Sequence, residues 1–362
     1  MQNIEQTNQT EANTGQDYLG AITHETVHHN PSNIMPSASE IAYLWSSYLA
    51  ETMSVCMLKY IVAKSENPDF KPIFQRALDI SSKRLRSMAD IFNFIKHPLP
   101  AGFGENDVET NAKELYSESF LITYTRLTNR YILHQYSQAY GISYLPQIRD
   151  LFYECISTCR EIIQKSTDVL LAKGLLIKTP NIVIPDRVEY VYDKNYYGSL
   201  VGTKRPLNAL EISYLFDNME SKLILETLSL GTSQTVKDEK VKKHLSRGKK
   251  ITDKQVKVLG SLLEKEDLPV PTTSDFEITT STESPFSDKL IMFHLTVVTA
   301  YSILGYGMSL TNTSRKDVAA AFGRLILELI HFAKDGTDLM IERGWLEKPP
   351  ETADRGELIK LN

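Results

Sequence analysis

The residues with the clearest potential for chemistry form the motif Glu328-Leu329-Ile330-His331. A di-iron site inside a helical bundle takes glutamates from two helices and a Glu-x-x-His motif from each of two others, because bridging carboxylates hold the paired metals. Glu226 and His294 are further residues of the right type in the same half of the chain. The corresponding predicted helices of the first half lack a Glu-x-x-His motif, so the ligand set is incomplete.

The spacing of Glu328 and His331 also has a simpler interpretation. Together with Asp335 and Asp338, they follow one ridge of a predicted helix. The same ridge in the first half of the chain carries Glu161 and Lys165, an i,i+4 pair that is typical of a solvated helix face. We therefore predict no metal ion, no cofactor and no catalytic residue. The weak candidates for a metal site are Glu328, His331, His294 and Glu226.

A second motif, His24-Glu25-Thr26-Val27-His28, has the HExxH spacing with which a helix presents two histidines to zinc. His29, Asn30 and Pro31 follow directly, and no apolar run flanks the motif to embed such a helix in a core. Residues 1–36 are rich in Gln, Asn, Thr and Ser. This composition predicts a disordered polar tail, not a zinc protease site.

Composition and charge narrow the function classes. Apolar residues make up 42% and charged residues 23% of the 362 residues, as in an ordinary globular protein. The N-terminus lacks the pattern of a signal peptide, we expect no window of about 18 apolar residues anywhere in the chain, and three cysteines do not make a disulfide framework. We expect a cytoplasmic protein with no membrane contact.

Basic residues concentrate in one predicted helix, near 237–265, but the sequence does not favour a nucleic acid partner. The net charge of the chain is −5, acidic residues are interleaved with the basic ones, and no aromatic series is present for stacking on bases. A solvated face or a contact with an acidic protein is the better interpretation. The basic residues are Lys237, Lys240, Lys242, Lys243, Arg247, Lys249, Lys250, Lys254 and Lys257, and their counterparts in the first half are Lys71, Arg76, Lys83, Arg84 and Arg86.

Apolar residues recur at helical spacing from Ser37 onward, and prolines interrupt the pattern. The spacing predicts helices near 37–62, 70–96, 114–140 and 147–173. The connections between them are short, long and short, and the long one, Pro98 to Asn111, can cross a bundle from end to end. This is the connection pattern of a ferritin-like bundle.

The chain contains an internal duplication, which predicts a second set of helices near 208–232, 237–265, 285–311 and 314–343. Four sequence blocks recur in the same order at nearly one spacing. Glu40–Trp45 recurs as Glu211–Phe216, Pro98-Leu99-Pro100 as Pro269-Val270-Pro271, Tyr116–Glu118 as Phe286–Asp288, and Thr167–Pro180 as Thr337–Pro350.

The duplication also aligns several polar residues of the predicted cores. His134 and His294 lie on the inward stripes of the two third helices, where a hydrogen-bonded core histidine is the favoured interpretation, and Tyr124 aligns with His294. Glu51 aligns with Lys222, which predicts either one ion pair in each half or a contact between the halves.

These repeated motifs resemble a domain-of-unknown-function family of tandem ferritin-like four-helix bundles from endospore-forming bacteria, loosely related to spore coat protein F. The resemblance rests on the EIAYLW and EISYLF openings, the Pro-x-Pro crossovers, the FSD sequence and the TD to PP endings. It agrees with an all-α fold of two bundles over 37–180 and 207–350, a linker over 181–206 and a C-terminal tail over 351–362. The resemblance implies no activity and no catalytic residues.

We therefore expect an uncharacterised structural or interaction protein, arranged as an internal pseudo-dimer, with protein partners or self-association. The resemblance adds a sporulation context and incorporation into the spore coat. Two alternatives stay open: a metal-binding ferritin-like oxidase or storage protein, and a small-molecule binder that uses the tyrosine-rich bundle interior.

Overall fold

The computed structural model describes residues 34–200, 202, 204–272 and 277–360. The HExxH sequence at 24–28 and most of the predicted polar tail lie outside these ranges. Within them the regular secondary structure is helical, with two isolated β-bridges. The first half forms α2 (Ala38–Lys64), α3 (Lys71–Phe94), α4 (Glu118–Ile142) and α5 (Pro146–Ala172), and the second half forms α6 (Ala209–Ser233), α7 (Glu239–Glu264), α8 (Asp288–Asn312) and α9 (Lys316–Glu342). The all-α fold and the duplicated four-helix units are confirmed.

The helix ends follow local capping chemistry that is repeated in the two units. Ser37 and Asn208 each form a capping box with the glutamate three residues later. Ser117 and Ser287 cap α4 and α8 through their hydroxyl groups. Gly174 and Gly344, with φ of 69° and 65°, end α5 and α9 in the left-handed conformation that glycine adopts without strain.

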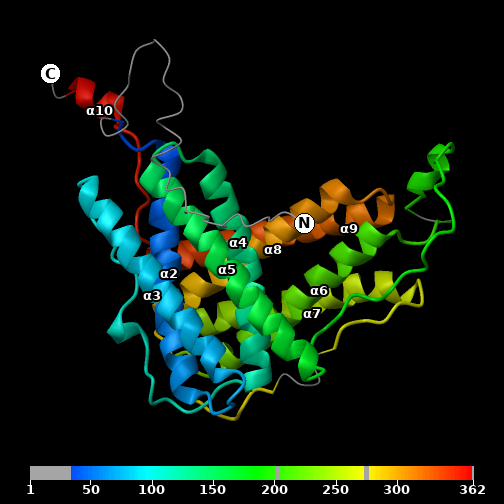
Figure 1. Cartoon of the computed structure of the whole chain (residues 1–362), viewed down its shortest axis with the longest axis horizontal. Coiled ribbons are helices and arrows are strands. Elements are labelled where there is room, and N and C mark those ends of the chain that lie inside the picture. Colours follow the sequence, from blue (N-terminus) through cyan, green and yellow to red (C-terminus); the bar gives the residue numbers. More distant parts are fainter. Residues whose placement is uncertain (1–33, 201, 203, 273–276, 361–362) are drawn as a thin grey trace, which may run out of the picture.

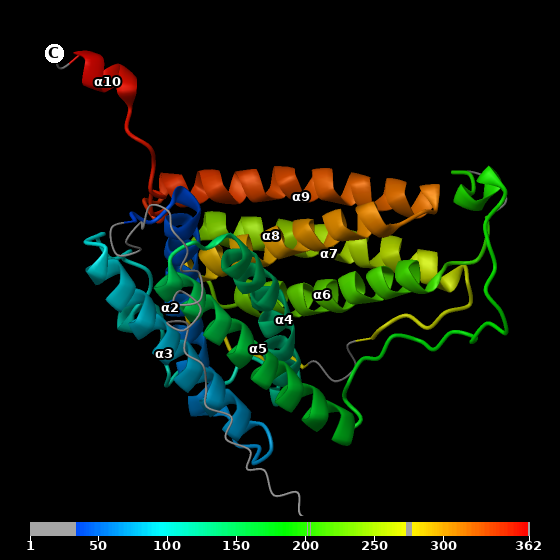
Figure 2. The same cartoon turned by 45° about the horizontal axis from the view of Figure 1, so that its top comes forward.

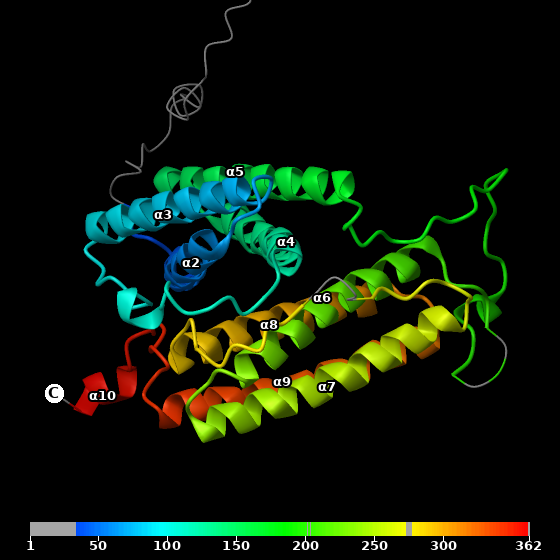
Figure 3. The ribbon, with the colours of Figure 1, turned by 90° about the horizontal axis from the view of Figure 1, so that it is seen from below.

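The two units pack side by side, and their inner helices face each other. In Figure 3 the order of layers is α3 with α5, then α2 with α4, then α6 with α8, then α7 with α9, while Figure 2 shows that the axes of the two bundles cross. The contacts agree with this order, because α2 packs on α3 and α4, α6 packs on α7 and α8, and α4 contacts α6 across the interface. One hydrophobic cluster contains residues of all eight long helices. The units therefore share a core.

The crossovers that precede α4 and α8 pair with each other symmetrically. Val108 bridges to Phe286, and Tyr116 bridges to Ile278. The Ser287 amide donates to the Asp107 carbonyl, and the Ser117 amide donates to the Glu277 carbonyl. Each contact thus occurs twice, with the roles of the two units exchanged, as in an isologous dimer interface.

Some positions meet their own counterparts in the other unit. Tyr124 and His294, which are 170 residues apart, are joined by a hydrogen bond of 2.8 Å. Tyr131 and Tyr301 stack with ring centroids 5.0 Å apart. Residues that contact their own duplicates must lie near a two-fold axis, so the predicted internal pseudo-dimer is present in the fold.

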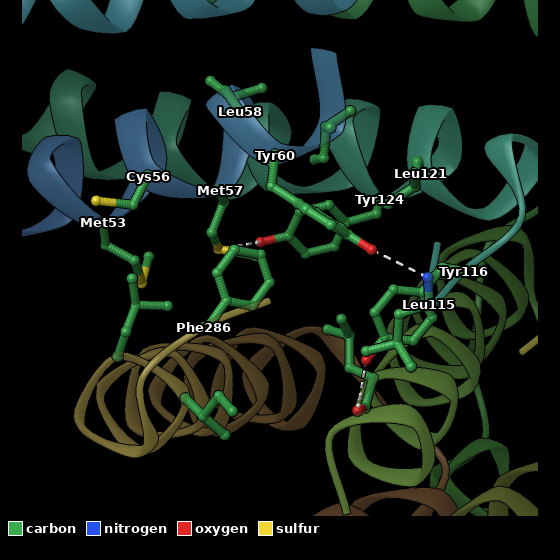
Figure 4. Close-up of a cluster of buried hydrophobic side chains, with 14 of the residues drawn as sticks. Met53, Cys56, Met57, Leu58, Tyr60, Leu115, Tyr116, Leu121, Tyr124 and Phe286 are labelled. Atoms are coloured by element: carbon green, nitrogen blue, oxygen red, sulfur yellow. Dashed lines mark hydrogen bonds between the residues drawn. The ribbon is translucent and has the colours of Figure 1, made fainter. Parts of the chain in front are cut away.

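The symmetry is broken where a tyrosine replaces a glycine. Tyr60 packs edge-on against Phe286 with centroids 5.4 Å apart, and its hydroxyl accepts from the Leu115 amide (Figure 4). On the other side of the axis, the counterpart of Tyr60 is Gly231. The Tyr116 ring lies directly over Gly231, and the Tyr116 hydroxyl donates to the Leu228 carbonyl. Gly231 is required because any side chain would occupy the space of that ring.

We predict that Gly231→Ala destabilises the protein by about 1–3 kcal/mol, because its Cβ would lie 2.4 Å from Cε1 of Tyr116. Urea denaturation measures the change. The matched control is Gly307→Ala in α8, where a Cβ meets nothing within 4 Å, and which should stabilise by roughly 0.5–1 kcal/mol. In a Tyr116→Ala background the cost of Gly231→Ala should vanish; a cost that persists there would show that the ring contact is not its cause.

Three sequence expectations need correction. His134 is exposed on α4 and does not lie in the core. Within the linker, Lys204 pairs with Asp317 at the start of α9 and Arg205 lies over the Tyr196 ring, but the side chains of residues 182–192 are exposed and do not pack on the surface. Finally, α8 is long and apolar enough to cross a membrane by length and composition, with a mean hydropathy of 1.5 over its best window. The packing of α8 explains its apolar composition, because the helix contacts α9 and α6 and also faces the other unit.

Candidate functional site

The four weak metal candidates do not come together. Glu328 lies on α9 and accepts hydrogen bonds from Lys254 at 2.6 Å and Gln255 at 3.0 Å. His331 is exposed, and Glu226 lies 3.9 Å from Lys249. His294 is buried at the interface between the units, bonded to Tyr124. In the described part of the chain, no group of three or more His, Cys, Asp or Glu side chains is placed to hold a metal ion.

The acidic ridge of α9 is neutralised by the basic face of α7. Lys254 pairs with Glu328, and Arg247 pairs with Asp335. Burial alone would raise the pKa of Glu328, but the hydrogen bonds from Lys254 and Gln255 hold it below its usual range. Ion pairing between two helices therefore uses part of the charge that a nucleic acid or a metal would need.

Each bundle has a buried polar group at the same place in its interior. In the first unit, Arg84 donates to Glu51 at 3.0 Å, to the Cys155 carbonyl at 2.9 Å and to the Thr158 hydroxyl at 2.7 Å. The Tyr136 hydroxyl donates to the same carboxylate. Glu51 and Arg84 are nearly fully buried, so their charges must compensate each other.

In the second unit the same positions carry Lys222, Gln255 and Tyr306. Tyr306 donates to Gln255 at 2.9 Å, and the Lys222 ammonium nitrogen lies 4.9 Å from the centre of the Tyr306 ring. Lys222 is 1% exposed, and its nitrogen has no hydrogen-bond partner. Burial lowers the pKa of Lys222 to about 7. Of the two predicted alternatives, an ion pair in each unit is present in the first unit only, because Lys222 has no ion-pair partner among the described residues.

The sequence allowed only some of these buried polar residues to be predicted. Glu51 lies on an inward stripe as predicted, but Arg84 was grouped with the exposed basic residues and is in fact buried. The position of Arg84 between Ile80 and Met88, both buried, marks it as part of the apolar face of α3. Cys155 and Cys159 lie beside the Arg84 guanidinium and are buried, and burial raises their pKa values, so they are poor nucleophiles.

We predict that Lys222→Met raises stability by roughly 1–3 kcal/mol near pH 7, because it removes an unpartnered polar group from the core. Since the folded pKa lies near 7 and the unfolded value near 10.5, the unfolded chain binds the extra proton between these values. The free energy of unfolding should therefore rise with pH across this window in the wild type and rise less in Lys222→Met. Thermal denaturation at several pH values measures both slopes.

The matched control for this prediction is Lys59→Met, at an exposed position of α2. It should keep the pH dependence of the wild type. If the free energy of unfolding changed equally with pH in the wild type and in Lys222→Met, Lys222 would not have a lowered pKa in the folded protein.

The linker exposes an unusual run of large apolar side chains. Val183 is 91% exposed and Tyr192 is 92% exposed. Figures 1 and 2 show this segment looping away from both bundles before the short helix η3 (Lys194–Tyr197). The exposed residues, which we call the linker strip, are Ile182, Val183, Ile184, Val188, Tyr190, Val191 and Tyr192.

A family model described as a protein of unknown function (DUF3231) matches residues 26–188 and again residues 197–358. The chain belongs to the DUF3231 family. Its two matched segments correspond to the two bundles, so each bundle is one DUF3231 unit.

Comparison with solved structures finds a crystal structure of a putative spore coat protein from Bacillus halodurans. It is 18% identical, with a TM-score of 0.40, and the match covers 41% of this chain and 98% of that chain. The search of curated proteins gives no significant match.

Proposed function

We propose that the protein is a non-enzymatic structural protein that associates with a second copy of itself through the linker strip. The observation that carries this proposal is the exposure of seven large apolar side chains within the range 182–192. Contiguous apolar surface of this kind on a globular protein usually marks an interaction site. Residues 182–192 belong to no helix or strand, so their backbone groups are available for pairing with another strand.

The charges of the strip favour a second copy as the partner. Arg187 and Glu189 flank Val188, are both exposed, and pair with each other within one chain at 3.1 Å (Nε to Oε1), an exposed pair that can exchange for the same pair between two copies. In an antiparallel pairing of two copies centred on Val188, Arg187 of each copy faces Glu189 of the other. In this register Tyr190 lies opposite Asp186 and Tyr192 lies opposite Ile184 of the other copy, so Ile184, Val188 and Tyr192 of both copies share one face of the paired strands.

The interiors of the bundles support a role outside catalysis. In ferritin-like proteins, metals bind at side chains that project into the bundle core. Here the described core positions hold the Glu51–Arg84 pair in one unit and Lys222 with Gln255 in the other. Arginine and lysine do not ligate iron, and a cation nearby disfavours binding of a second cation.

Sedimentation velocity over a range of concentrations tests the self-association. The wild type should form a dimer, and Val188→Asp should be monomeric. Arg187→Glu should weaken the dimer roughly tenfold, because two like-charged pairs replace two opposite ones. The double variant Arg187→Glu with Glu189→Arg should restore it, since the swap keeps both pairs complementary.

The matched control for association is Tyr153→Asp, which removes an exposed aromatic side chain from α5. It should associate as the wild type does. A wild type that stays monomeric at all concentrations, or a charge swap that fails to restore a dimer lost in Arg187→Glu, would overturn the proposal.

Metal analysis separates this proposal from the oxidase or storage alternative. We expect less than one iron or manganese per chain in protein purified without an affinity tag, unchanged in Glu328→Ala and His331→Ala. Stoichiometric metal that both substitutions remove would favour the oxidase. We also expect that self-association serves incorporation into the spore coat. Fractionation of spores tests this by showing whether the protein is found in the coat fraction.

A further inference from the structure

A cavity lies at the interface between the two units, close to the pseudo-two-fold axis. Its volume is about 80 Å³, and it is lined by residues of α2, α3, α4, α5, α6 and α8. A water molecule needs roughly 10–15 Å³, so the cavity can hold a group larger than one water molecule. Most of the lining is apolar, and Figure 4 shows two of the lining residues, Met57 and Tyr124, joined by a contact between sulfur and hydroxyl.

Beyond the interface, the cavity reaches the outer helices α3 and α5 of the first unit but not the outer helices α7 and α9 of the second, and the duplication explains why. In the second unit, His244 stacks on Phe332 with ring centroids 4.2 Å apart and fills the corresponding space. The counterpart of Phe332 in the first unit is the smaller Ile162, which lines the cavity. Ser54, another lining residue, has the larger Leu225 as its counterpart. The first unit thus retains a space that the second unit closes with side chains.

The charges around the cavity favour an uncharged occupant. The lining includes one cationic side chain, Arg84, and Glu51 compensates its charge at 3.0 Å. Burial lowers the pKa of His294 to about 4, so the imidazole that lines the cavity is neutral near pH 7. An ion that entered would lose its hydration without gaining a counter-charge.

The polar groups converge at one end of the cavity. The Tyr124 hydroxyl and the His294 Nε2 are 2.8 Å apart, and both residues line the cavity. A phenolic oxygen has two acceptor lone pairs and one donor, so Tyr124 can bond to His294 and still accept from a ligand hydroxyl. The Tyr131 and Tyr301 rings, stacked on each other, also line the cavity and offer aromatic edges.

We propose that this cavity is a binding site for a small, uncharged aromatic molecule with one hydroxyl group, of the phenol class. The ring occupies the apolar space that reaches toward Ile162, and the hydroxyl bonds to the Tyr124–His294 pair. The site depends on both units, because Tyr124 comes from the first and His294 from the second.

Calorimetric titration of the full chain with phenol, toluene and benzoate tests the proposal. Phenol should bind, and benzoate should bind at least tenfold more weakly because it carries a charge. Tyr124→Phe should weaken phenol binding roughly 3–10-fold, the value of one hydrogen bond, and leave toluene binding unchanged.

Two independent variants fill the cavity with the residue that the second unit carries. Ser54→Leu and Ile162→Phe should each abolish binding of phenol and toluene, while circular dichroism confirms that the helices are intact. The matched control is Ser137→Leu, at an exposed position of α4, which should bind phenol as the wild type does. A folded wild type that binds neither compound, binding that survives both fillings, or a Tyr124→Phe variant that loses no preference for phenol would each overturn the proposal.

Discussion

The contact of each DUF3231 unit with its own duplicate is the constraint on which the rest of the fold depends. A surface that faces its own copy must be self-complementary, and residues on the axis must fit a residue at the same position of the other unit. The backbone is self-complementary in this sense, because the Ser117 and Ser287 amides donate to equivalent carbonyls of the opposite unit. Because the hydrophobic cluster at this interface runs through both units, the inner helices are apolar on more than one face and the outer helices are amphipathic.

Fusion of the two units in one chain removes the requirement that they be identical. Tyr124 opposite His294 and Tyr60 opposite Gly231 could not arise by one substitution in a homodimer, where any change occurs on both sides of the axis. The interiors have diverged in the same way. The first unit compensates Glu51 with Arg84, whereas the second surrounds an unpartnered Lys222 with Gln255 and Tyr306. Both arrangements are energetically costly for an apolar core, because a charged or polar side chain loses its hydration on burial.

The sequence predicted the helices well because their signals are local. Ser37, Ser117, Gly174 and Gly344 act on the backbone of their own turns, and the repeat confirmed each boundary a second time. The site was less predictable, because periodicity shows which residues share a face and not what that face meets. His134 is exposed although the spacing placed it on the inward stripe of its helix, whereas Arg84, a charged residue, is buried because it lies on the apolar face of α3. The meeting of Tyr124 with His294 depends on where the axis passes, which no spacing along one helix encodes.

The paired crossovers also bear on how the chain is made. The segment around Val108 finds its bridging partner at Phe286, far downstream in the sequence. At an elongation rate of roughly 5–20 residues per second, the intervening chain takes roughly 9–36 s to synthesise. During that interval the first bundle leaves the ribosome with the apolar side of α2 and α4 uncovered. The nascent chain is therefore most vulnerable to wrong association after its first half is complete and before its second half exists.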